Sequence, residues 1–280
     1  MIDLHSHILP SLDDGAADLN EALAMAQAYV ADGVEVVACT PHILPGLYHN
    51  TGTEIRKAVG QLQAQIIEAG IDLTLVTGAD NHVVPDFAQA IAAGHLLTLA
   101  DSRYVLVEPP HHVAPPGLDK FFFDLIVAGY TPILTHPERL TWIRQHYALI
   151  AELVGGGVWM QITSGSLIGR FGKGPRYWGE RMLDDGLVHI LASDAHNTER
   201  RKPDLGRGRD AAAKRVGVQE SENLVATRPK GVLENIDPAE LAPPPGTGMP
   251  LGGVHEGGDN ESGARSARGG FSGCLRRLIG

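Results

Sequence analysis

One stretch of sequence decides the fold: Gly186-Leu-Val-His-Ile-Leu-Ala-Ser193-Asp194-Ala195-His196. It begins with a glycine where a helical segment ends, continues as an apolar run typical of a buried strand, and finishes in residues that bind metals or phosphate. Related units span residues 33–42, 70–80, 129–136 and 157–164. Apolar runs at 2–5 and 104–108 complete a set of seven predicted strands, each followed by polar residues.

Helical segments separate these strands. In residues 19–31, for example, Leu19, Leu23 and Val30 recur at helical spacing. The other predicted helices span residues 54–69, 86–93, 118–128, 143–154, 177–185 and 204–215. Apolar strands that alternate with helices in this way are typical of a parallel sheet covered by helices. We therefore predict an α/β fold, a distorted TIM-like barrel of seven β/α units, in which the strand ends meet at one mouth.

The composition excludes several classes of protein. A chain of 280 residues with 43% hydrophobic residues has enough material for a large core, which excludes a mostly disordered protein. The net charge of −10 argues against binding to nucleic acid. Cys39 and Cys274 lie too far apart in sequence to indicate a disulfide framework. The chain has neither a signal-peptide pattern nor an apolar run long enough for stable membrane insertion, so we expect a cytoplasmic protein.

The composition changes near Ala242. Residues 243–280 contain 11 Gly and 4 Pro in 38 positions, about 39%, against about 15% in the preceding residues. Such a segment has too little apolar material to form a core. We therefore predict one domain over residues 1–242 and a disordered Gly/Pro-rich tail over 243–280.

Side chains that can bind a metal stand at nearly every predicted strand end. Five are histidines and four are carboxylates: His5, His7, Asp14, His42, Asp80, Glu108, His136, Asp194 and His196. His5 and His7 point to the same side because side chains alternate along a strand. Nine candidates exceed the needs of one ion, so two or three ions are expected, with Glu108 able to bridge two. Imidazole and carboxylate without thiolate suit Mn²⁺, Fe²⁺ or Zn²⁺.

Several motifs resemble those of the PHP superfamily, named for polymerase and histidinol phosphatase. They are His5-Ser-His7, Thr40-Pro-His42, Leu106-Val-Glu108, Thr135-His136-Pro-Glu-Arg139 and Ser193-Asp194-Ala195-His196-Asn197. Within this superfamily the chain resembles the CpsB/CapC family of bacterial manganese-dependent tyrosine-protein phosphatases. Residues 3–15 and 161–173 carry that closer resemblance.

The resemblance implies a centre of three ions and two arginines that hold phosphate. The first ion would take His5, His7, Glu108 and Asp194; the second His42, Glu108 and His136; the third Asp14, His196 and the residue at position 80. The family usually has Glu at position 80, and Asp80 is shorter by one methylene, roughly 1.5 Å of reach. The arginines would be Arg139 and Arg201, whose planar guanidinium groups suit phosphate oxygens.

The implied activity is hydrolysis of phosphotyrosine by a metal-activated hydroxide, with Mn²⁺ as the expected ion. The implied substrate is the autophosphorylated C-terminal tail of a bacterial tyrosine kinase of capsule or exopolysaccharide synthesis. His82, His111 and His112 are candidates to protonate the leaving phenolate, and Asp13 is interpreted as a spare loop carboxylate. Cysteine phosphatase chemistry is excluded, because that mechanism needs Arg six residues after the cysteine, and the sixth residue after Cys39 is Pro45.

Two alternatives remain open from the sequence. A small-molecule phosphomonoesterase such as histidinol phosphatase would use the same metal ligands, since substrate choice depends on the loops. The other alternative is a barrel that has lost catalysis and acts as a binding or regulatory module.

Overall fold

Parallel strands form the centre of the computed structural model, which describes residues 1–246. Nine strands lie in this range: β1 (Ile2–Ser6), β2 (Val36–Cys39), β3 (His42–Ile43), β4 (Thr74–Thr77), β5 (Asp80–His82), β6 (Tyr104–Glu108), β7 (Thr131–Thr135), β8 (Trp159–Thr163) and β9 (Ile190–Ala192). They form a three-stranded sheet of order β1-β2-β4 and a six-stranded sheet of order β3-β5-β6-β7-β8-β9. Every strand pair is parallel. The expected parallel α/β fold is confirmed.

Each of the seven predicted runs contains a strand, but two of them are interrupted. The run at 33–42 is divided into β2 and β3 at Thr40-Pro41, and the run at 70–80 into β4 and β5 at Gly78-Ala79. Pro41 has no N–H to donate to a neighbouring strand, so pairing is lost at that point. This pair of interruptions is why the strands are assigned to two sheets.

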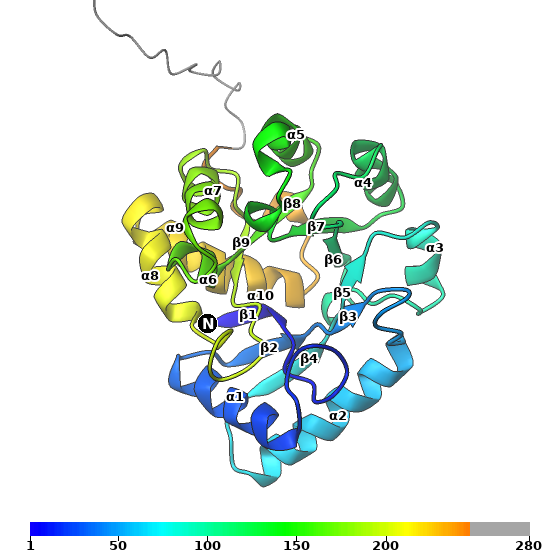
Figure 1. The fold of residues 1–280 in the computed structure, drawn as a ribbon, viewed down its shortest axis with the longest axis vertical. Coiled ribbons are helices and arrows are strands. Elements are labelled where there is room, and N and C mark those ends of the chain that lie inside the picture. Colours follow the sequence, from blue (N-terminus) through cyan, green and yellow to red (C-terminus); the bar gives the residue numbers. More distant parts are fainter. Residues whose placement is uncertain (247–280) are drawn as a thin grey trace, which may run out of the picture. The chain divides into compact units, whose positions relative to one another are not determined.

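Backbone contacts connect the first strand to the last. Ser6 forms a parallel bridge with Ala195, directly after β9. On either side, the N–H of Asp194 donates to the carbonyl of His5 at 3.0 Å and the N–H of His7 donates to the carbonyl of Ala195 at 2.9 Å. The parallel strands thus curve round, and helices surround them (Figure 1).

The helices follow the predicted order. The α-helices are α1 (Leu19–Ala31), α2 (Gly52–Glu68), α3 (Phe87–Ala92), α4 (Leu118–Val127), α5 (Ile143–Gly155), α6 (Ser164–Leu167), α7 (Lys173–Asp184), α8 (Leu205–Val216), α9 (Val218–Glu222) and α10 (Arg228–Leu233). Short 3₁₀ turns span Leu99–Asp101, Pro137–Arg139 and Pro238–Glu240, and a π-helical turn spans Asn223–Thr227. Helix α1 has the predicted bounds. Helix α7 begins four residues before the predicted start at Tyr177, and the short helices α6, α9 and α10 were not predicted.

Two apolar clusters support the strand ends. The larger fills the space between strands and surrounding helices and includes Met25, Phe122 and Leu134. The smaller joins one or two residues from most strands to the helical C-terminal part: Leu4, Ala38, Leu99, Tyr104, Leu106, Ile133, Trp159, Ile190 and Val232. In five strands, a member of the smaller cluster precedes a predicted metal ligand by one to four residues. Apolar packing therefore lies directly beneath the polar strand ends.

The described chain continues four residues beyond the predicted domain boundary at Ala242. Arg228 Nε donates to the carbonyl of Ala242 at 2.7 Å, and the N–H of Gly246 donates to the carbonyl of Gly186 at 3.1 Å. The remainder of the predicted tail, residues 247–280, lies outside the described residues. Among residues 1–246, no helix is both long enough and apolar enough to cross a membrane.

Candidate metal centre

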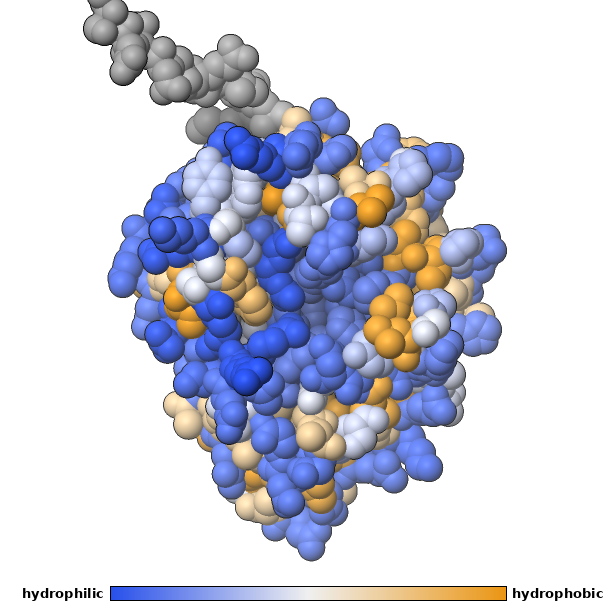
Figure 2. Space-filling model, viewed as in Figure 1, coloured by the Kyte–Doolittle hydropathy of each residue, from blue (hydrophilic) through white to orange (hydrophobic). Residues whose placement is uncertain are grey.

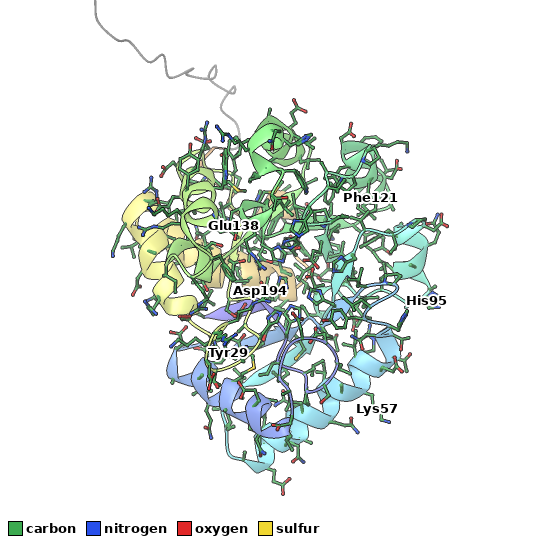
Figure 3. All side chains as sticks on the ribbon, viewed as in Figure 1. Tyr29, Lys57, His95, Phe121, Glu138 and Asp194 are labelled. Carbon is green, nitrogen blue, oxygen red and sulfur yellow. The ribbon has the colours of Figure 1, made fainter. Side chains whose placement is uncertain are left out.

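The nine predicted ligands all come together at the C-terminal ends of the strands. His5 lies in β1, His42 in β3, Asp80 in β5 and Glu108 at the end of β6. The other members follow a strand or lie in the loop after β1: His7, Asp14, His136, Asp194 and His196. Asp194 occupies the middle of the molecule (Figure 3). This region is a hydrophilic hollow at the centre of the face shown in Figure 2.

His5 and His7 present the same nitrogen to the centre. Their Nε2 atoms lie 3.2 Å apart, as predicted from strand alternation. Behind them, His5 Nδ1 donates to Gln161 Oε1 at 2.7 Å, and His7 Nδ1 donates to Asp13 Oδ2 at 2.6 Å. Such contacts fix the tautomer and the ring orientation of a metal-binding histidine.

Asp13 is therefore not a spare carboxylate. Besides His7, it accepts hydrogen bonds from the backbone N–H of His42 at 2.9 Å and of Gly15 at 2.9 Å. Gly15 permits this loop to fold back, because a Cβ at that position would lie 2.0 Å from the carbonyl oxygen of His7. The same tight loop places Asp14 beside His196, with Oδ1 3.3 Å from Nε2.

Asp80 lies between two imidazoles. Its Oδ2 is 3.5 Å from His5 Nε2 and 3.4 Å from His42 Nδ1. Asp80 forms a group that could hold a metal ion with His5 and His7. Asp14 forms another such group with His7, His42 and His196. The geometry differs from the implied third set, in which the residue at position 80 accompanies Asp14 and His196. The start of β5 directly after Gly78-Ala79 brings the shorter Asp80 side chain to the first pair of histidines.

Glu108 faces four imidazoles. Its Oε2 lies 3.2 Å from His42 Nδ1 and also contacts His82 Nε2, while its Oε1 lies 3.1 Å from His111 Nε2 and 3.6 Å from His136 Nε2. Two groups able to hold an ion share this carboxylate. This is the geometry expected of a bridging ligand. His82 and His111 thus belong to the cluster, whereas His112 is exposed and lies beside the ring of His111.

Asp194 joins the imidazoles to the two arginines. Its Oδ1 lies 3.5 Å from His5 Nε2 and 3.3 Å from His7 Nε2. Its Oδ2 accepts from Arg139 and, at 2.5 Å, from Arg201. Asp194 has a left-handed backbone, with φ 51°, as does His136, with φ 37°. Residues other than glycine rarely adopt this conformation, and it costs of order 1–3 kcal/mol where surrounding structure holds it.

Burial and close charges shift the pKa values of the cluster strongly. Burial disfavours a charged Glu108, but the neighbouring imidazoles of His111, His42 and His82 hold its pKa well below the usual range. Burial likewise opposes the charge on Asp194, yet Arg201, His5 and Arg139 hold its pKa well below normal. Burial and the neighbouring His7 lower the pKa of His196 to about 4. Glu108 and Asp194 are thus anionic and His196 is neutral at pH 7, which are the protonation states that bind metal. Burial opposes the charge on His42, but Asp80 and Glu108 raise its pKa to about 11, so a metal must displace a proton there.

Several buried polar atoms of the cluster have no hydrogen-bond partner. Among the described residues they include His42 Nδ1, both carboxylate oxygens of Asp80, Glu108 Oε2, Asp194 Oδ1 and His196 Nε2. An unpartnered buried polar atom costs about 1–3 kcal/mol, more where it is charged. So many of them facing one centre fit a set of divalent cations, since each atom is a nitrogen or oxygen donor of the type such ions bind.

The comparisons with known proteins agree with this geometry. The family model described as "Capsular polysaccharide synthesis, CpsB/CapC" matches residues 1–234. The chain belongs to the CpsB/CapC family. It is 40% identical to tyrosine-protein phosphatase YwqE of Bacillus subtilis and 33% identical to the putative tyrosine-protein phosphatase CapC of Staphylococcus aureus. In both cases the match covers 72% of this chain and 79% of the relative.

A solved structure extends the similarity to this CpsB/CapC fold. It comes from crystal structures of YwqE from Bacillus subtilis and CpsB from Streptococcus pneumoniae, described as metal-dependent tyrosine phosphatases. The TM-score is 0.81 at 36% sequence identity, over 85% of this chain and 96% of that chain. The expected family is therefore confirmed by sequence and by structure.

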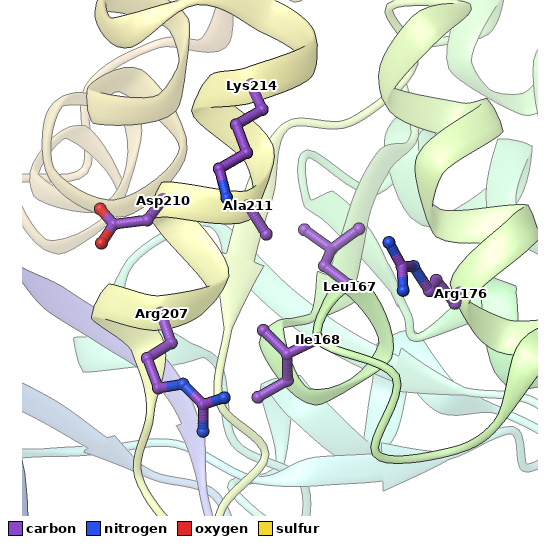
Figure 4. A pocket seen from close by; sticks show the side chains of 7 residues that line it. All are labelled: Leu167, Ile168, Arg176, Arg207, Asp210, Ala211 and Lys214. Atoms are coloured by element: carbon purple, nitrogen blue, oxygen red, sulfur yellow. The ribbon is translucent and has the colours of Figure 1, made fainter.

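A second cavity lies apart from the histidine cluster, on the outer side of α6 between α7 and α8 (Figure 4). It has a volume of about 400 Å³ and is lined by Leu167, Ile168, Arg176, Arg207, Asp210, Ala211 and Lys214. Arg176 donates to Glu180 at 2.8 Å, and Arg207 lies 3.4 Å from Asp204. Carboxylates thus offset two of its three cations, and the cavity contains none of the predicted ligands.

Proposed function

We propose that the protein is a metal-dependent tyrosine-protein phosphatase that hydrolyses phosphotyrosine with the aid of two or three Mn²⁺ ions. One observation supports this most: nine predicted ligands and two arginines from separate strand ends meet in one cluster whose buried donor atoms lack partners. Relatives named tyrosine-protein phosphatases at up to 40% identity support the choice of phosphotyrosine.

The proposed ligands are the nine residues His5, His7, Asp14, His42, Asp80, Glu108, His136, Asp194 and His196. When bound, clustered divalent ions polarise phosphoryl oxygens and lower the pKa of a coordinated water. Mn²⁺ fits a mixed imidazole and carboxylate set, and Fe²⁺ and Zn²⁺ fit the same donors. Asp13 and Gln161 orient two of the imidazoles, and the short reach of Asp80 is offset by its position between His5 and His42.

Arg139 and Arg201 are proposed to hold the phosphate. Both guanidinium groups already meet at one oxygen of Asp194, at the edge of the ligand cluster. Each can donate two parallel hydrogen bonds to phosphoryl oxygens and so neutralise charge that develops in the transition state. The tyrosine phenolate, with a pKa near 10, is a moderate leaving group, so the demand on a general acid is small.

The proposed physiological substrate is an autophosphorylated tyrosine kinase of capsule or exopolysaccharide synthesis, in keeping with the description of the family. We place the protein in the cytoplasm, where its buried free thiol, Cys39, would stay reduced. We count the architecture as a distorted seven-unit barrel, since β2 with β3 and β4 with β5 each fill one place. The catalytic domain is proposed to end near Ala242, with residues 243–280 outside it.

The test is phosphate release from a phosphotyrosine peptide and from histidinol phosphate, measured side by side. Protein stripped with a chelator is assayed with and without Mn²⁺, next to the His42→Ala and Arg139→Ala variants. We expect release from the peptide only with metal, loss of metal binding and most activity in His42→Ala, and weaker phosphate binding in Arg139→Ala. Full activity without metal would refute the mechanism. Preference for histidinol phosphate would assign a small-molecule phosphatase.

A further inference from the structure

An aromatic ring lies against both arginines of the proposed phosphate site. The Cζ atom of Arg139 lies 4.5 Å from the centroid of the Phe171 ring, and the Cζ atom of Arg201 lies 6.0 Å from it. These distances are within the range of cation–π contact. Since both guanidinium groups also reach Asp194, Phe171 stands at the edge of the site where a phosphoryl group would bind.

The position of Phe171 is fixed by its surroundings. A Cβ at Gly165 would lie 2.9 Å from the Phe171 Cε2 atom, so the ring packs closely against the Gly165 backbone and would have to shift if that residue carried a side chain. The preceding residue, Arg170, donates its backbone N–H to the carbonyl of Gly165 at 2.8 Å and its side chain to Asp204 Oδ1 at 2.9 Å. The ring is thus packed on Gly165, and the residue that precedes it is fixed by hydrogen bonds.

The start of the same loop is held by a buried carboxylate. Glu138 Oε1 accepts hydrogen bonds from the backbone N–H of Thr163 at 2.9 Å and from Ser166 Oγ at 2.7 Å. Because Glu138 directly precedes Arg139, the segment that carries Phe171 and the arginine it contacts are tied together. The spacing between ring and guanidinium is therefore built into the fold.

Phe171 is only partly buried. Phe87 and Phe122, which belong to the larger apolar cluster, are buried. A phenyl ring has no polar atom with which to bind phosphate or metal. What it offers beside an anion site is an apolar surface. In phosphotyrosine, one bridging ester oxygen joins the aromatic ring to the phosphorus atom. A ligand whose phosphate is held by the two arginines therefore brings its ring close to Phe171.

We propose that Phe171 forms the wall against which the aromatic ring of an aryl phosphate packs while Arg139 and Arg201 hold the phosphate. The inference rests on the proposed function and adds the residue that selects aryl over alkyl phosphates. Aromatic pairs prefer offset or edge-to-face geometry and strengthen binding by about two- to tenfold beyond the area they bury.

The test uses two phosphonates that cannot be hydrolysed, phenylphosphonate and methylphosphonate, titrated by calorimetry into the full chain loaded with Mn²⁺. We expect the wild type to bind phenylphosphonate more tightly. Phe171→Leu should reduce that preference by about two- to tenfold while the affinity for methylphosphonate changes little. The matched control is Phe123→Leu, since Phe123 is 63% exposed on α4 and should leave the preference unchanged.

A second variant tests the role of the Phe171 ring, and a separate assay distinguishes failure of this proposal from failure of the proposed phosphatase activity. Gly165→Ala displaces the ring without removing it and should also reduce the phenyl preference. Equal weakening of both phosphonates in Phe171→Leu would mean that the ring only positions the arginines, and an unchanged preference would mean that it has no role; either result overturns the proposal. A phenyl preference in a protein that fails to release phosphate from phosphotyrosine peptides would leave the aromatic wall intact and refute the phosphatase activity.

Discussion

Asp13 shows how one side chain can organise the proposed metal centre without being one of its ligands. It accepts from His7 Nδ1, from the backbone of His42 and from the backbone of Gly15, so it connects two ligands to one loop. Burial opposes protonation of His7, but the charge of Asp13 overrides this effect and raises the pKa of His7 to about 9. A metal that displaces the proton then finds the imidazole already oriented.

Replacement of Asp13 by Asn should weaken Mn²⁺ binding by about 10–100-fold, the usual effect of losing a carboxylate behind a metal-binding histidine. Calorimetric titration of chelator-treated protein with Mn²⁺ measures this. The matched control is Asp72→Asn, which changes an exposed carboxylate in the loop before β4 and should leave the affinity unaltered. An Asp13→Asn protein with wild-type affinity would show that the hydrogen bond to His7 has no part in metal binding.

At the scale of elements, the stability of the scaffold depends on contacts at the starts of its helices and strands. Helix α2 begins with a capping box, in which Thr51 accepts from the backbone of Glu54 and Glu54 accepts from the backbone of Thr51. Just before β9, His189 is buried, stacks on Trp159 and accepts at Nδ1 from the backbone of Met160 at 3.1 Å. Neither contact involves a proposed ligand, so both test the scaffold alone.

Thr51→Ala should lower the free energy of unfolding by about 1 kcal/mol, because the first turn of α2 loses its side-chain cap. Urea denaturation with Mn²⁺ present and absent checks the value and should show an unchanged Mn²⁺ affinity. Thr53→Ala in the same turn is the control, since that exposed side chain makes no capping bond. Equal stability of the Thr51→Ala and Thr53→Ala variants would count against the cap.

His189 should make the fold sensitive to acid. Burial and the nearby Arg228 lower its pKa to about 3, whereas an unfolded histidine titrates near 6.5. Below pH 6.5 the unfolded chain therefore binds a proton that the folded chain does not. The contribution of His189 to the free energy of unfolding is complete above pH 6.5. As the pH falls from 6.5 toward 3, this contribution decreases by about 1.4 kcal/mol per pH unit.

The measurement compares wild type with His189→Asn, which keeps an acceptor for Met160 but does not titrate. The variant should show a shallower fall of unfolding free energy between pH 6 and pH 4. His95→Asn, on an exposed side chain at the rim of the molecule, is the control and should keep the wild-type slope (Figure 3). Identical slopes in His189→Asn and wild type would exclude His189 as the source.

For the whole molecule, the ligand cluster connects segments from both ends of the domain. His5 lies in its first strand and His7 directly after that strand, whereas Asp194 and His196 follow its last. Ions that bind only this assembled arrangement stabilise the folded state, by about 2.7 kcal/mol at a free concentration of 100 times Kd.

Removal of metal should therefore lower Tm by about 5–10 °C, as judged from the usual response of a domain of this size. Scanning calorimetry of chelator-treated protein with and without Mn²⁺ makes the comparison. His42→Gln serves as the control, because it removes a ligand of two groups and should respond less to Mn²⁺. A wild-type Tm that ignores both chelator and Mn²⁺ would exclude a structural contribution of the metal.

The repeated pattern of apolar run and polar end predicted much of this architecture. It located all seven strand regions, and the nine candidates that follow them do lie together, because parallel strands place their carboxyl ends at one edge. The interruptions at Pro41 and Gly78 were not predicted, because each lies near the polar end of its run, where the pattern does not distinguish the end of one strand from a break between two. Helices α6, α9 and α10 are too short to show a helical period.

The supporting contacts were less accessible to sequence reasoning. Gln161 lies inside an apolar strand, and its contact with His5 joins residues 156 positions apart. Asp13 gave no signal beyond its proximity to Asp14. The packing of Phe171 on Gly165 depends on the turn after β8, which only the folded chain reveals. Residue type thus predicted which side chains gather at the strand ends, while their orientation depends on tertiary contacts.

The bridge between Ser6 and Ala195 has a consequence for protein synthesis. A nascent chain that ends before Asp194 already displays His5 and His7, but it lacks the backbone partners that fix both residues and the carboxylate that faces them. The proposed ligands can therefore meet only after residues 194–196 have left the ribosome. We expect the folded domain, and not the emerging peptide, to bind the proposed ions.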